Sequence, residues 1–431
     1  MTRLRPSDLA ISNLGTPRFP SPMGNRGALV VEDREGVLVG STLAELEDSS
    51  SPATFERAGP RERLFFEPGR AKAGIVTCGG LCPGLNNVIR SVVLTLHHHY
   101  DVQEILGFRF GYAGLSNARP QEPLALTPEL VESVHERGGT VLGSSRGPQD
   151  LAEVADNLER WGVDVLFTLG GDGTLRGASA LAAELARRGR KTAVVGIPKT
   201  IDNDLLWVER SFGFATAVEA ASQAILAAHA EARGAWNGIG LVKLMGRHSG
   251  FITAHASLAS SDVNYCLVPE VPFTLEGFLG SLEERLASRH HAVVAVAEGA
   301  AQDLLAGASP EAFDPSGNRR LDDVGVFLRD RIQGHFKGQG MPVTVKYIDP
   351  SYIIRSLPAG TLDAEFCLSL GQQAVHAAMA GKTDLMIGFW NRHFTHVPLA
   401  MATAERRQID PGGALWSRVL GATGQPVAMG S

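Results

Sequence analysis

From residue 71 onwards, short apolar runs alternate with longer stretches in which apolar residues recur at helical spacing. The runs that predict strands are residues 73–77, 163–169, 192–197, 239–244, 291–297 and 343–348. Strands that alternate with helices of about ten to fifteen residues indicate parallel α/β sheets covered on both faces. In such sheets ligands bind beyond the carboxyl ends of the strands, and the clusters of glycine and polar residues follow the runs at that end.

The first 70 residues follow no such pattern. Serine and proline gather at residues 49–52, and the apolar runs there are short. We interpret residues 1–70 as an N-terminal extension and residues 401–431 as a C-terminal tail. The sequence does not reveal a function for either.

Composition and charge narrow the classes of protein to which the chain can belong. The chain has 431 residues, of which 44% are hydrophobic and 20% charged, as expected for a globular protein of two or three domains. The net charge of −6 argues against a nucleic-acid partner, which would need a basic surface. No apolar run is long enough to cross a bilayer and the first residues lack an apolar signal core, so we expect a cytoplasmic protein without a membrane partner.

Two features resemble metal sites. Cys78 and Cys82 are four residues apart, but no second pair with ligand spacing follows them. We therefore interpret both, together with Cys266 and Cys367, as packed and reduced thiols. The histidines at residues 97–99 end an amphipathic helix, where polar or cationic side chains suit the helix dipole.

The loop after residues 73–77 contains two adjacent glycines, Gly79 and Gly80. Glycines directly after a strand let backbone amides approach an anion, and the next helix start favours negative charge. The loop lacks the Gly-Lys-Ser/Thr of a Walker loop. By itself, its pattern is as typical of a tight turn as of a phosphate site.

The loop after residues 163–169 predicts a phosphate site with a metal ion. Its residues are Gly170, Gly171, Asp172, Gly173 and Thr174. Asp172 is placed to hold Mg²⁺ against a phosphate, because Mg²⁺ uses one or two protein carboxylates together with substrate oxygens. Thr174 opens the helix, where its hydroxyl can cap the helix or contact phosphate. A plain turn is the alternative for Asp172, but the glycines on both sides favour a ligand loop.

The loop after residues 192–197 carries two carboxylates, Asp202 and Asp204, within the sequence Pro-Lys-Thr-Ile-Asp-Asn-Asp. In an extended segment, side chains two residues apart point the same way. One carboxylate can then take a hydroxyl proton while the other organises a metal. A solvated turn is the alternative. We favour a catalytic role for the two carboxylates because the Asp172 loop is expected to lie beside them.

Taken together and in this order, the motifs resemble the phosphofructokinase family. They are Gly-Gly-Asp-Gly-Thr at 170–174, Pro-Lys-Thr-Ile-Asp-Asn-Asp at 198–204, Met-Gly-Arg at 245–247 and Pro-Glu at 269–270. The resemblance extends over residues 71–381 and implies an α/β fold with two Rossmann-like parallel-sheet domains behind the N-terminal extension. It implies a donor-binding domain of residues 71–210, joined by part of 355–400, and a fructose 6-phosphate domain of residues 211–355.

The resemblance also implies the roles of single residues. Asp202 is similar to the catalytic base that accepts the proton of the sugar 1-hydroxyl, and Asp172 to the Mg²⁺ ligand, with Asp204 in support. Thr200 is similar to the residue that contacts the transferring phosphoryl group, and Lys199 and Arg146 to cations that neutralise its charge. The residues implied for binding the donor are Gly79, Gly80, Arg146, Gly171, Asp172, Gly173 and Thr174.

The residues implied for binding fructose 6-phosphate come from several loops. They are Thr200, Ile201, Asp202, Met245, Gly246, Arg247, Glu270, Lys346, Tyr352 and Arg355. Short bacterial members of the family have a histidine where Tyr352 stands and an arginine where Lys346 stands, and both replacements still donate to phosphate. Those members also bring an arginine from a neighbouring subunit, which the matching residues 236–240 lack.

Two positions bear on the phosphoryl donor. In this family, glycine at the position of Gly173 leaves room for a nucleotide, whereas aspartate is typical of pyrophosphate users. Lysine at the position of Lys199 is typical of pyrophosphate users, so the chain is mixed and resembles the long ATP-dependent members of plants, trypanosomatids and some bacteria. We predict ATP, because an aspartate at residue 173 would place an anion beside the α-phosphate, while Lys199 helps either donor.

Other interpretations stay open. One is a pyrophosphate-dependent phosphofructokinase, another an NAD or lipid kinase with the same glycine-rich loop, and a third a non-catalytic regulatory subunit. NAD and lipid kinases do not account for Arg247 with Glu270 and Arg355, and a decayed subunit would be expected to lose Asp172 or Asp202. The resemblance further implies an allosteric homodimer or homotetramer, whose effectors cannot be read from the sequence.

Overall fold

The computed structural model describes residues 4–430, apart from residues 25, 26, 28, 44–51, 120, 306–312 and 314–318. The chain divides into two compact units. The first unit comprises Met1–Ile201, Leu205–Gly213 and Leu357–Glu405, and the second Asp202–Asp204, Phe214–Ser356 and Arg406–Ser431. The loop at residues 198–204 is therefore divided, because Thr200 and Ile201 belong to the first unit and Asp202 to the second.

The first unit is built on a large sheet, for which nine strands are found in the described part of the chain, in the order β3-β4-β17-β16-β10-β9-β6-β7-β8. Their bounds are Gly36–Leu38, Thr54–Arg57, His393–Pro398, Leu385–Trp390, Ala193–Pro198, Val165–Gly170, Lys72–Thr77, Glu104–Phe108 and Leu124–Ala125. The pairs from β16 to β7 are parallel, and the outer pairs are antiparallel. Every residue of β9 and β10 is buried, as expected for parallel strands covered on both faces.

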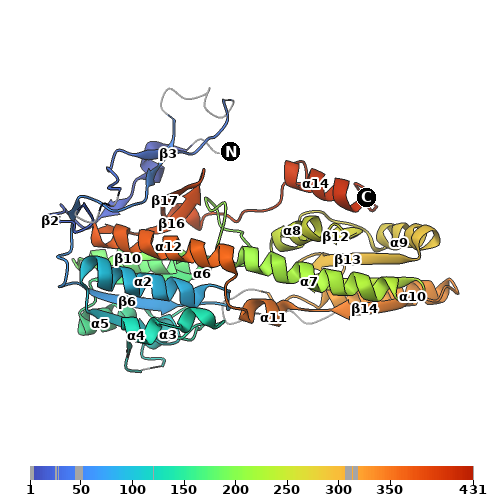
Figure 1. Cartoon of the computed structure of the whole chain (residues 1–431), viewed down its shortest axis with the longest axis horizontal. Helices are drawn as coiled ribbons and strands as arrows, with labels where there is room; N and C mark the ends of the chain where they lie inside the picture. The colour runs from blue at the N-terminus through green and yellow to red at the C-terminus, as the bar shows by residue number, and fades with distance from the viewer. Residues whose placement is uncertain are drawn as a thin grey trace. The chain divides into compact units, whose positions relative to one another are not determined.

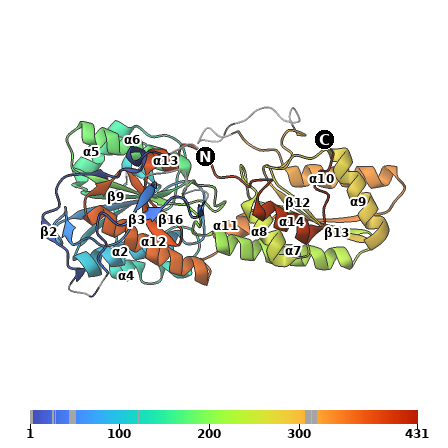
Figure 2. The same cartoon turned by 90° about the horizontal axis from the view of Figure 1, so that it is seen from above.

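Helices cover both faces of this sheet (Figure 2). On one face α2 (Leu85–Tyr100) and α12 (Thr361–Met379) pack against each other and, with α4 (Pro128–Val131), enclose a core. On the other face lie α5 (Leu151–Trp161), α6 (Asp172–Arg187) and α13 (Leu399–Ala402). The short helices α3 (Tyr112–Leu115) and η3 (Val134–Glu136) follow β7 and α4. Alternate strand residues enter the two cores, for instance Phe167 one and Leu166 the other.

The N-terminal extension contains the short helix η1 (Pro6–Leu9) and five short strands among its described residues. Of these, β3 and β4 continue the large sheet through β17. The strand β1 (Ser12–Asn13) pairs with β15 (Lys382–Thr383), and β2 (Phe19–Pro20) pairs with β5 (Arg63–Leu64). The extension is thus part of the first unit rather than a separate body.

The second unit has a parallel sheet with the strand order β12-β13-β11-β14 in its described residues. Their bounds are Tyr265–Leu267, His291–Ala297, Gly238–Leu244 and Thr344–Ile348. One face packs on α9 (Leu275–Arg289) and α10 (Val324–Gly338), and the other on α7 (Phe214–Arg233) and α8 (Phe251–Ser260) (Figures 1 and 2). The helix α7 lies so close to β11 that a Cβ at Gly240 would come within 2.6 Å of the Ala228 carbonyl oxygen.

Residues 406–431 of the C-terminal tail complete the second unit. Its helix α14 (Ala414–Thr423) packs on α8. After it, the Gln425 side chain accepts a hydrogen bond from Cys266 N (2.7 Å) and donates one to Cys266 O (3.4 Å). One buried amide side chain thereby satisfies both backbone groups of Cys266 on the outer edge of β12, where no neighbouring strand pairs with it in the described residues.

The strands expected from the apolar runs are confirmed as β6, β9, β10, β11, β13 and β14, and the α/β fold with two parallel sheets is confirmed with them. The histidines at residues 97–99 lie in the last turn of α2, as expected. Among the described residues, no helix is both long and apolar enough to cross a membrane.

Candidate active site

The glycine-rich loops after β6 and β9 and the start of the loop after β10 meet in the first unit because their strands are neighbours. The strands β10 and β9 pair in parallel with Pro198 opposite Gly170, and β9 pairs in parallel with β6 on its other side. Their carboxyl ends therefore lie along one edge of the sheet. Backbone bonds link the loops themselves, since Lys199 N donates to Gly170 O and Cys78 N donates to Leu169 O, each at 2.9 Å.

The middle loop leads directly into α6, whose first residue is Asp172. The helix start presents backbone N–H groups and the positive end of the helix dipole, both of which favour an anion. The Asp172 carboxylate lies in this first turn and accepts a hydrogen bond from Arg176 Nη1 at 2.8 Å. The positive end of α6 and one guanidinium therefore both act on the carboxylate that the sequence assigned to Mg²⁺.

The two glycines that flank this turn have opposite surroundings. A Cβ at Gly170 would lie 2.2 Å from the Thr174 hydroxyl, so glycine is required there for packing. A Cβ at Gly173 would meet no atom of the described residues within 4 Å. Gly173 therefore borders open space, as its predicted role beside a nucleotide requires.

The loop after β6 is clasped by the segment at residues 142–146. Gly79, at φ +85°, donates from its N–H to Ser145 O at 2.9 Å and accepts from Ser144 Oγ at 2.6 Å. Arg146 follows directly and is exposed. The structure thus brings Gly79 and the Arg146 segment together, although Ser145 comes 66 positions after Gly79 in the chain.

Lys199 is the buried cation among these loops. Its side chain is enclosed, and its Nζ donates to Gly80 O at 2.7 Å. A Cβ at Gly79 would lie 3.2 Å from that Nζ. A positive charge thus lies against the Gly79-Gly80 backbone, within the loop for which a phosphate site was predicted.

The acidic part of the third loop lies in the second unit. Asp204 is buried, its Oδ2 lies 3.2 Å from Arg406 Nη1, and its carbonyl accepts from Arg407 N at 2.8 Å. The C-terminal segment that begins at Arg406 therefore anchors this acidic sequence. In the first unit, Ser211 Oγ donates a hydrogen bond to Thr200 O and so fixes the backbone of the loop just before Asp202.

Four segments follow the parallel strands of the second unit, and six of the predicted sugar-phosphate residues lie on three of them. Met245, Gly246 and Arg247 follow β11, and Arg247 Nη2 donates to Arg319 O at 3.0 Å. Tyr352 and Arg355 lie on α11 (Ser351–Ser356) after β14, with the Arg355 guanidinium 4.7 Å from the centre of the exposed Tyr352 ring.

Glu270, after β12, has partners that the sequence did not suggest. Its carboxylate accepts from Gly250 N at 3.0 Å, where α8 begins, and from Ile409 N at 2.9 Å. Both donors are backbone groups, so this carboxylate joins the start of α8 to the C-terminal tail. The negative charge at the helix start also complements its dipole.

Lys346 lies in the middle of β14 rather than in a loop at its end. Its Nζ is 3.2 Å from Glu231 Oε2 on α7, and both side chains are well exposed. Lys346 pairs across the sheet with Gly240. The structure therefore separates Lys346 by several residues of chain from the loop that carries Tyr352 and Arg355.

Sequence reasoning missed Glu298, the first residue after β13. This carboxylate is half-buried, and burial raises its pKa, while the charges of Arg247, Arg355 and Lys243 oppose that rise. It thus lies among the cations proposed for the sugar phosphate. The available signal was its place directly after the strand at residues 291–297, because the loops after the neighbouring strands had been singled out.

No group of three or more His, Cys, Asp or Glu side chains in the described part of the chain is arranged to hold a metal. A Mg²⁺ site of one carboxylate completed by phosphate oxygens needs no such group, so Asp172 fits that chemistry.

All four cysteines are buried. Burial raises the pKa of the Cys78 thiol to about 11, so this thiol stays protonated at neutral pH.

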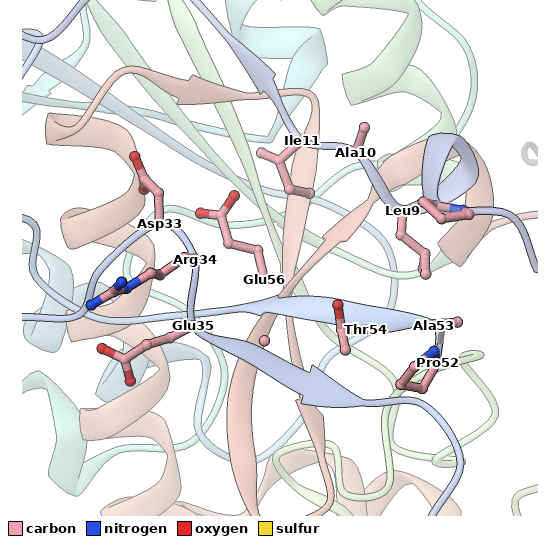
Figure 3. A pocket seen from close by; sticks show the side chains of 12 residues that line it. Leu9, Ala10, Ile11, Asp33, Arg34, Glu35, Pro52, Ala53, Thr54 and Glu56 are labelled. Carbon is pink, nitrogen blue, oxygen red and sulfur yellow. The ribbon is translucent and has the colours of Figure 1, made fainter. Parts of the chain in front are cut away.

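A pocket of about 240 Å³ lies elsewhere in the first unit (Figure 3). Its walls are Pro6, Leu9, Ala10, Ile11, Asp33, Arg34, Glu35, Gly36, Pro52, Ala53, Thr54 and Glu56. Its carboxylates are already paired, Asp33 and Glu56 with Arg61 and Lys382, and Glu35 with Arg57. None of these lining residues is among the predicted site residues, and β17 and β16 separate β4 from β10.

Comparison with known proteins gave matches over most of the chain. A family model described as phosphofructokinase matches residues 72–378. An ATP-dependent 6-phosphofructokinase of Amycolatopsis methanolica is 46% identical over 98% of this chain and 96% of the relative. One of Trypanosoma brucei brucei is 50% identical over 96% of this chain and 86% of the relative. The solved structure of a pyrophosphate-dependent phosphofructokinase from Marinobacter aquaeolei matches at a TM-score of 0.68 and 20% identity, covering 84% of this chain and 92% of that one, which shows a shared fold.

Proposed function

The chain belongs to the phosphofructokinase family, and on that premise we propose that it is an ATP-dependent 6-phosphofructokinase. It transfers the γ-phosphoryl group of ATP to the 1-hydroxyl of fructose 6-phosphate and yields fructose 1,6-bisphosphate. The observation that carries the proposal is the junction of three loops at the ends of β6, β9 and β10. The first two loops are glycine-rich, and the third supplies the enclosed Lys199. The names of the similar relatives support ATP as the donor.

The first unit supplies the donor half of the reaction. Backbone amides of the Gly79 loop and the start of α6 bind the phosphate chain, and Lys199 and Arg146 balance its charge. The open space at Gly173 admits the nucleotide next to the phosphates. In phosphoryl transfer most of the catalysis comes from such positioning and charge balance.

We assign Mg²⁺ to Asp172. When bound, the ion neutralises charge on the donor phosphates and draws on one carboxylate together with phosphate oxygens. Arg176 holds the Asp172 carboxylate in its present orientation, and the mostly exposed Arg176 side chain is free to turn toward solvent when the carboxylate changes partner.

The sugar half takes its contacts from the second unit, where Asp202 accepts the proton of the 1-hydroxyl as the attack begins. Arg247 and Arg355 bind the 6-phosphate, since guanidinium groups match phosphate oxygens in pairs. Tyr352 donates to the same phosphate, and Met245 and Gly246 line the sugar. The sugar contacts of Thr200 and Ile201, which belong to the first unit, stay predictions. Glu298 accepts hydrogen bonds from sugar hydroxyls. The sugar roles of Glu270 and Lys346 stay predictions, because their observed partners are Gly250, Ile409 and Glu231.

We also propose that the chain assembles into a homodimer or homotetramer under allosteric control. Light scattering on the purified protein measures the assembly directly. The cytoplasmic location stays a prediction from the sequence.

Product identification tests the proposed activity. The protein is incubated with ATP, Mg²⁺ and fructose 6-phosphate, and ³¹P spectra are followed. A second sugar phosphate signal and ADP are expected in equal amounts, and a parallel reaction with NAD as the acceptor should give no product. Phosphorylation of NAD instead of the sugar would favour the NAD kinase alternative, and fructose 6-phosphate binding without turnover would favour a regulatory subunit.

A further inference from the structure

Lys243 is a charged residue in the second unit to which neither motif nor resemblance assigned a role. It is the next-to-last residue of β11, two positions before Met245. Its side chain is only 13% exposed, and its Nζ lies 2.9 Å from Asp323 Oδ2 and 2.9 Å from Asp349 Oδ2. One enclosed ammonium group is therefore shared by two carboxylates.

The two carboxylates lead to different helices. Asp323 caps α10, since its Oδ1 accepts from Gly325 N at 3.0 Å and Val326 N at 3.1 Å, and it also accepts from the Tyr347 hydroxyl at 3.1 Å. Asp349 begins the turn into α11, because its Oδ1 accepts from Ser351 N at 3.1 Å and from Ser351 Oγ at 2.5 Å. Lys243 thus joins the end of β11 to the starts of both helices.

Only one of these helices carries proposed substrate contacts. The helix α11 has six residues, and Tyr352 and Arg355 are among them. So short a helix has too few internal hydrogen bonds to fix its own direction. Its direction is set by Asp349 at its start, and Asp349 in turn is set by Lys243.

The charges of Lys243, Asp323 and Asp349 favour a stable link between β11 and the two helices. Burial lowers the pKa of Lys243, but the hydrogen bonds to Asp323 and Asp349 outweigh this and raise it above the usual range. The ammonium therefore stays charged at every pH at which the enzyme would work. Removing it would leave two carboxylates facing each other without the charge that holds them, and such uncompensated pairs repel in a partly buried setting.

We propose that Lys243 is a positioning residue for the sugar phosphate, which acts through Asp349 to hold α11, and with it Tyr352 and Arg355, beside the Arg247 loop. This inference rests on the proposed function, since it names a further determinant of the same sugar-phosphate half. Lys243 acts on substrate affinity rather than on the transfer step.

The test compares single variants in steady-state kinetics. Lys243→Met is expected to raise KM for fructose 6-phosphate roughly ten- to a hundredfold, as a small misplacement of a binding group does, with KM for ATP changed less than about twofold. Lys243→Arg should restore most of the affinity, because it keeps the charge. Lys337→Met, an exposed lysine at the end of α10, is the matched control and should behave as the wild type.

Two further variants separate positioning from general support. Asp349→Asn should raise KM for the sugar phosphate about as much as Lys243→Met, and the double variant should be no worse than either. Asp323→Asn keeps an oxygen for capping α10 and should change KM little. A Lys243→Met protein with a lower melting temperature and an unchanged KM would overturn the proposal, as would additive effects in the double variant.

The activity of the wild-type protein distinguishes a failure of the proposed function from a failure of the positioning role of Lys243. If the wild type gave no turnover with ATP, the proposed function would fail, and calorimetric titration with fructose 6-phosphate would replace KM as the readout. Weaker binding by Asp349→Asn would then still support the positioning role, and unchanged binding would reject it. If Lys243→Met does not fold, Lys243→Arg and Asp349→Asn decide the matter.

Discussion

The two units hold their candidate phosphate sites by different means. In the first unit two of the loops are glycine-rich, backbone groups bind the loops to one another, and the third loop supplies the enclosed cation Lys199. In the second unit charged side chains at and after the strand ends are bound to one another, as Lys243 of β11 is to Asp323 and Asp349. A phosphate chain can be bound by any backbone N–H, whereas a particular sugar phosphate must be selected by side chains. The comparison teaches that the first site depends on space and the second on charge placement.

The largest effect is expected at Asp202, the residue proposed to accept the proton of the sugar 1-hydroxyl. Asp202→Asn removes the proposed base, so kcat should fall roughly 10²- to 10⁴-fold, the usual contribution of general base catalysis. KM for both substrates should change little, because the side chain keeps its size. Steady-state assays measure both quantities.

A matched control is Asp156→Asn, which alters a carboxylate on α5 that pairs with Arg188. It should leave kcat unchanged. An Asp202→Asn enzyme with at least a third of the wild-type kcat would remove Asp202 from the mechanism.

The dependence of the first site on space is tested at Gly173. Gly173→Asp places a carboxylate beside the donor phosphates, and two like charges about 4 Å apart repel by roughly 4 kcal/mol at the effective dielectric of a protein surface. We expect kcat/KM for ATP to fall roughly a thousandfold. Gly173→Ala should keep nearly full activity, because its Cβ meets no atom of the described residues within 4 Å. Retained use of ATP by the aspartate variant would contradict the proposed role of this position.

Gly170 provides the opposite case within the same loop. Gly170→Ala would put a Cβ 2.2 Å from the Thr174 hydroxyl, and Thr174 is a stiff β-branched residue at the start of α6. We expect a loss of about 1–3 kcal/mol in the free energy of unfolding, as overpacking usually causes. Denaturant titration of the Gly170→Ala and Gly173→Ala proteins measures the contrast. Equal stability of the two variants would show that the space around the loop has been misjudged.

The smallest effect is expected at Glu270. Glu270→Gln weakens the bonds to Gly250 N and Ile409 N and removes a favourable charge at the start of α8. We expect a loss of about 1 kcal/mol of stability and a change in KM for fructose 6-phosphate of less than about twofold. A tenfold higher KM at unchanged stability would instead support the direct sugar contact that the family resemblance implies.

The parts predicted from the sequence are those that depend on local order. The strands and the loops after β6, β9 and β10 were predicted because a continuous apolar run followed by glycines, or by two closely spaced carboxylates in the case of β10, is a local signal. The motifs, taken together and in their order, indicated the family, and the family resemblance then implied the roles of single residues. Neighbouring strands then brought the predicted donor residues to one edge of the sheet.

The parts that were not predicted depend on contacts between distant residues. Glu298 and Lys243 each stand alone in the sequence, and their importance comes from the cations and carboxylates that surround them. The partners of Glu270 include Ile409, 139 residues further along the chain, so no local pattern could reveal them. Gly170 and Gly173 look alike in the motif and differ in what their missing side chains would meet.

Donor preference is the most direct measurement of the proposed function. Purified protein is assayed with saturating fructose 6-phosphate and Mg²⁺, with ATP or pyrophosphate as the varied substrate. With ATP we expect turnover, and with pyrophosphate a kcat/KM at least about a hundredfold lower, because the space beside Gly173 admits the nucleotide and its contacts add to those of the phosphates. Turnover with pyrophosphate alone would contradict the proposal. It would indicate that the enclosed Lys199 serves pyrophosphate, as lysine at this position does in the pyrophosphate users of the family.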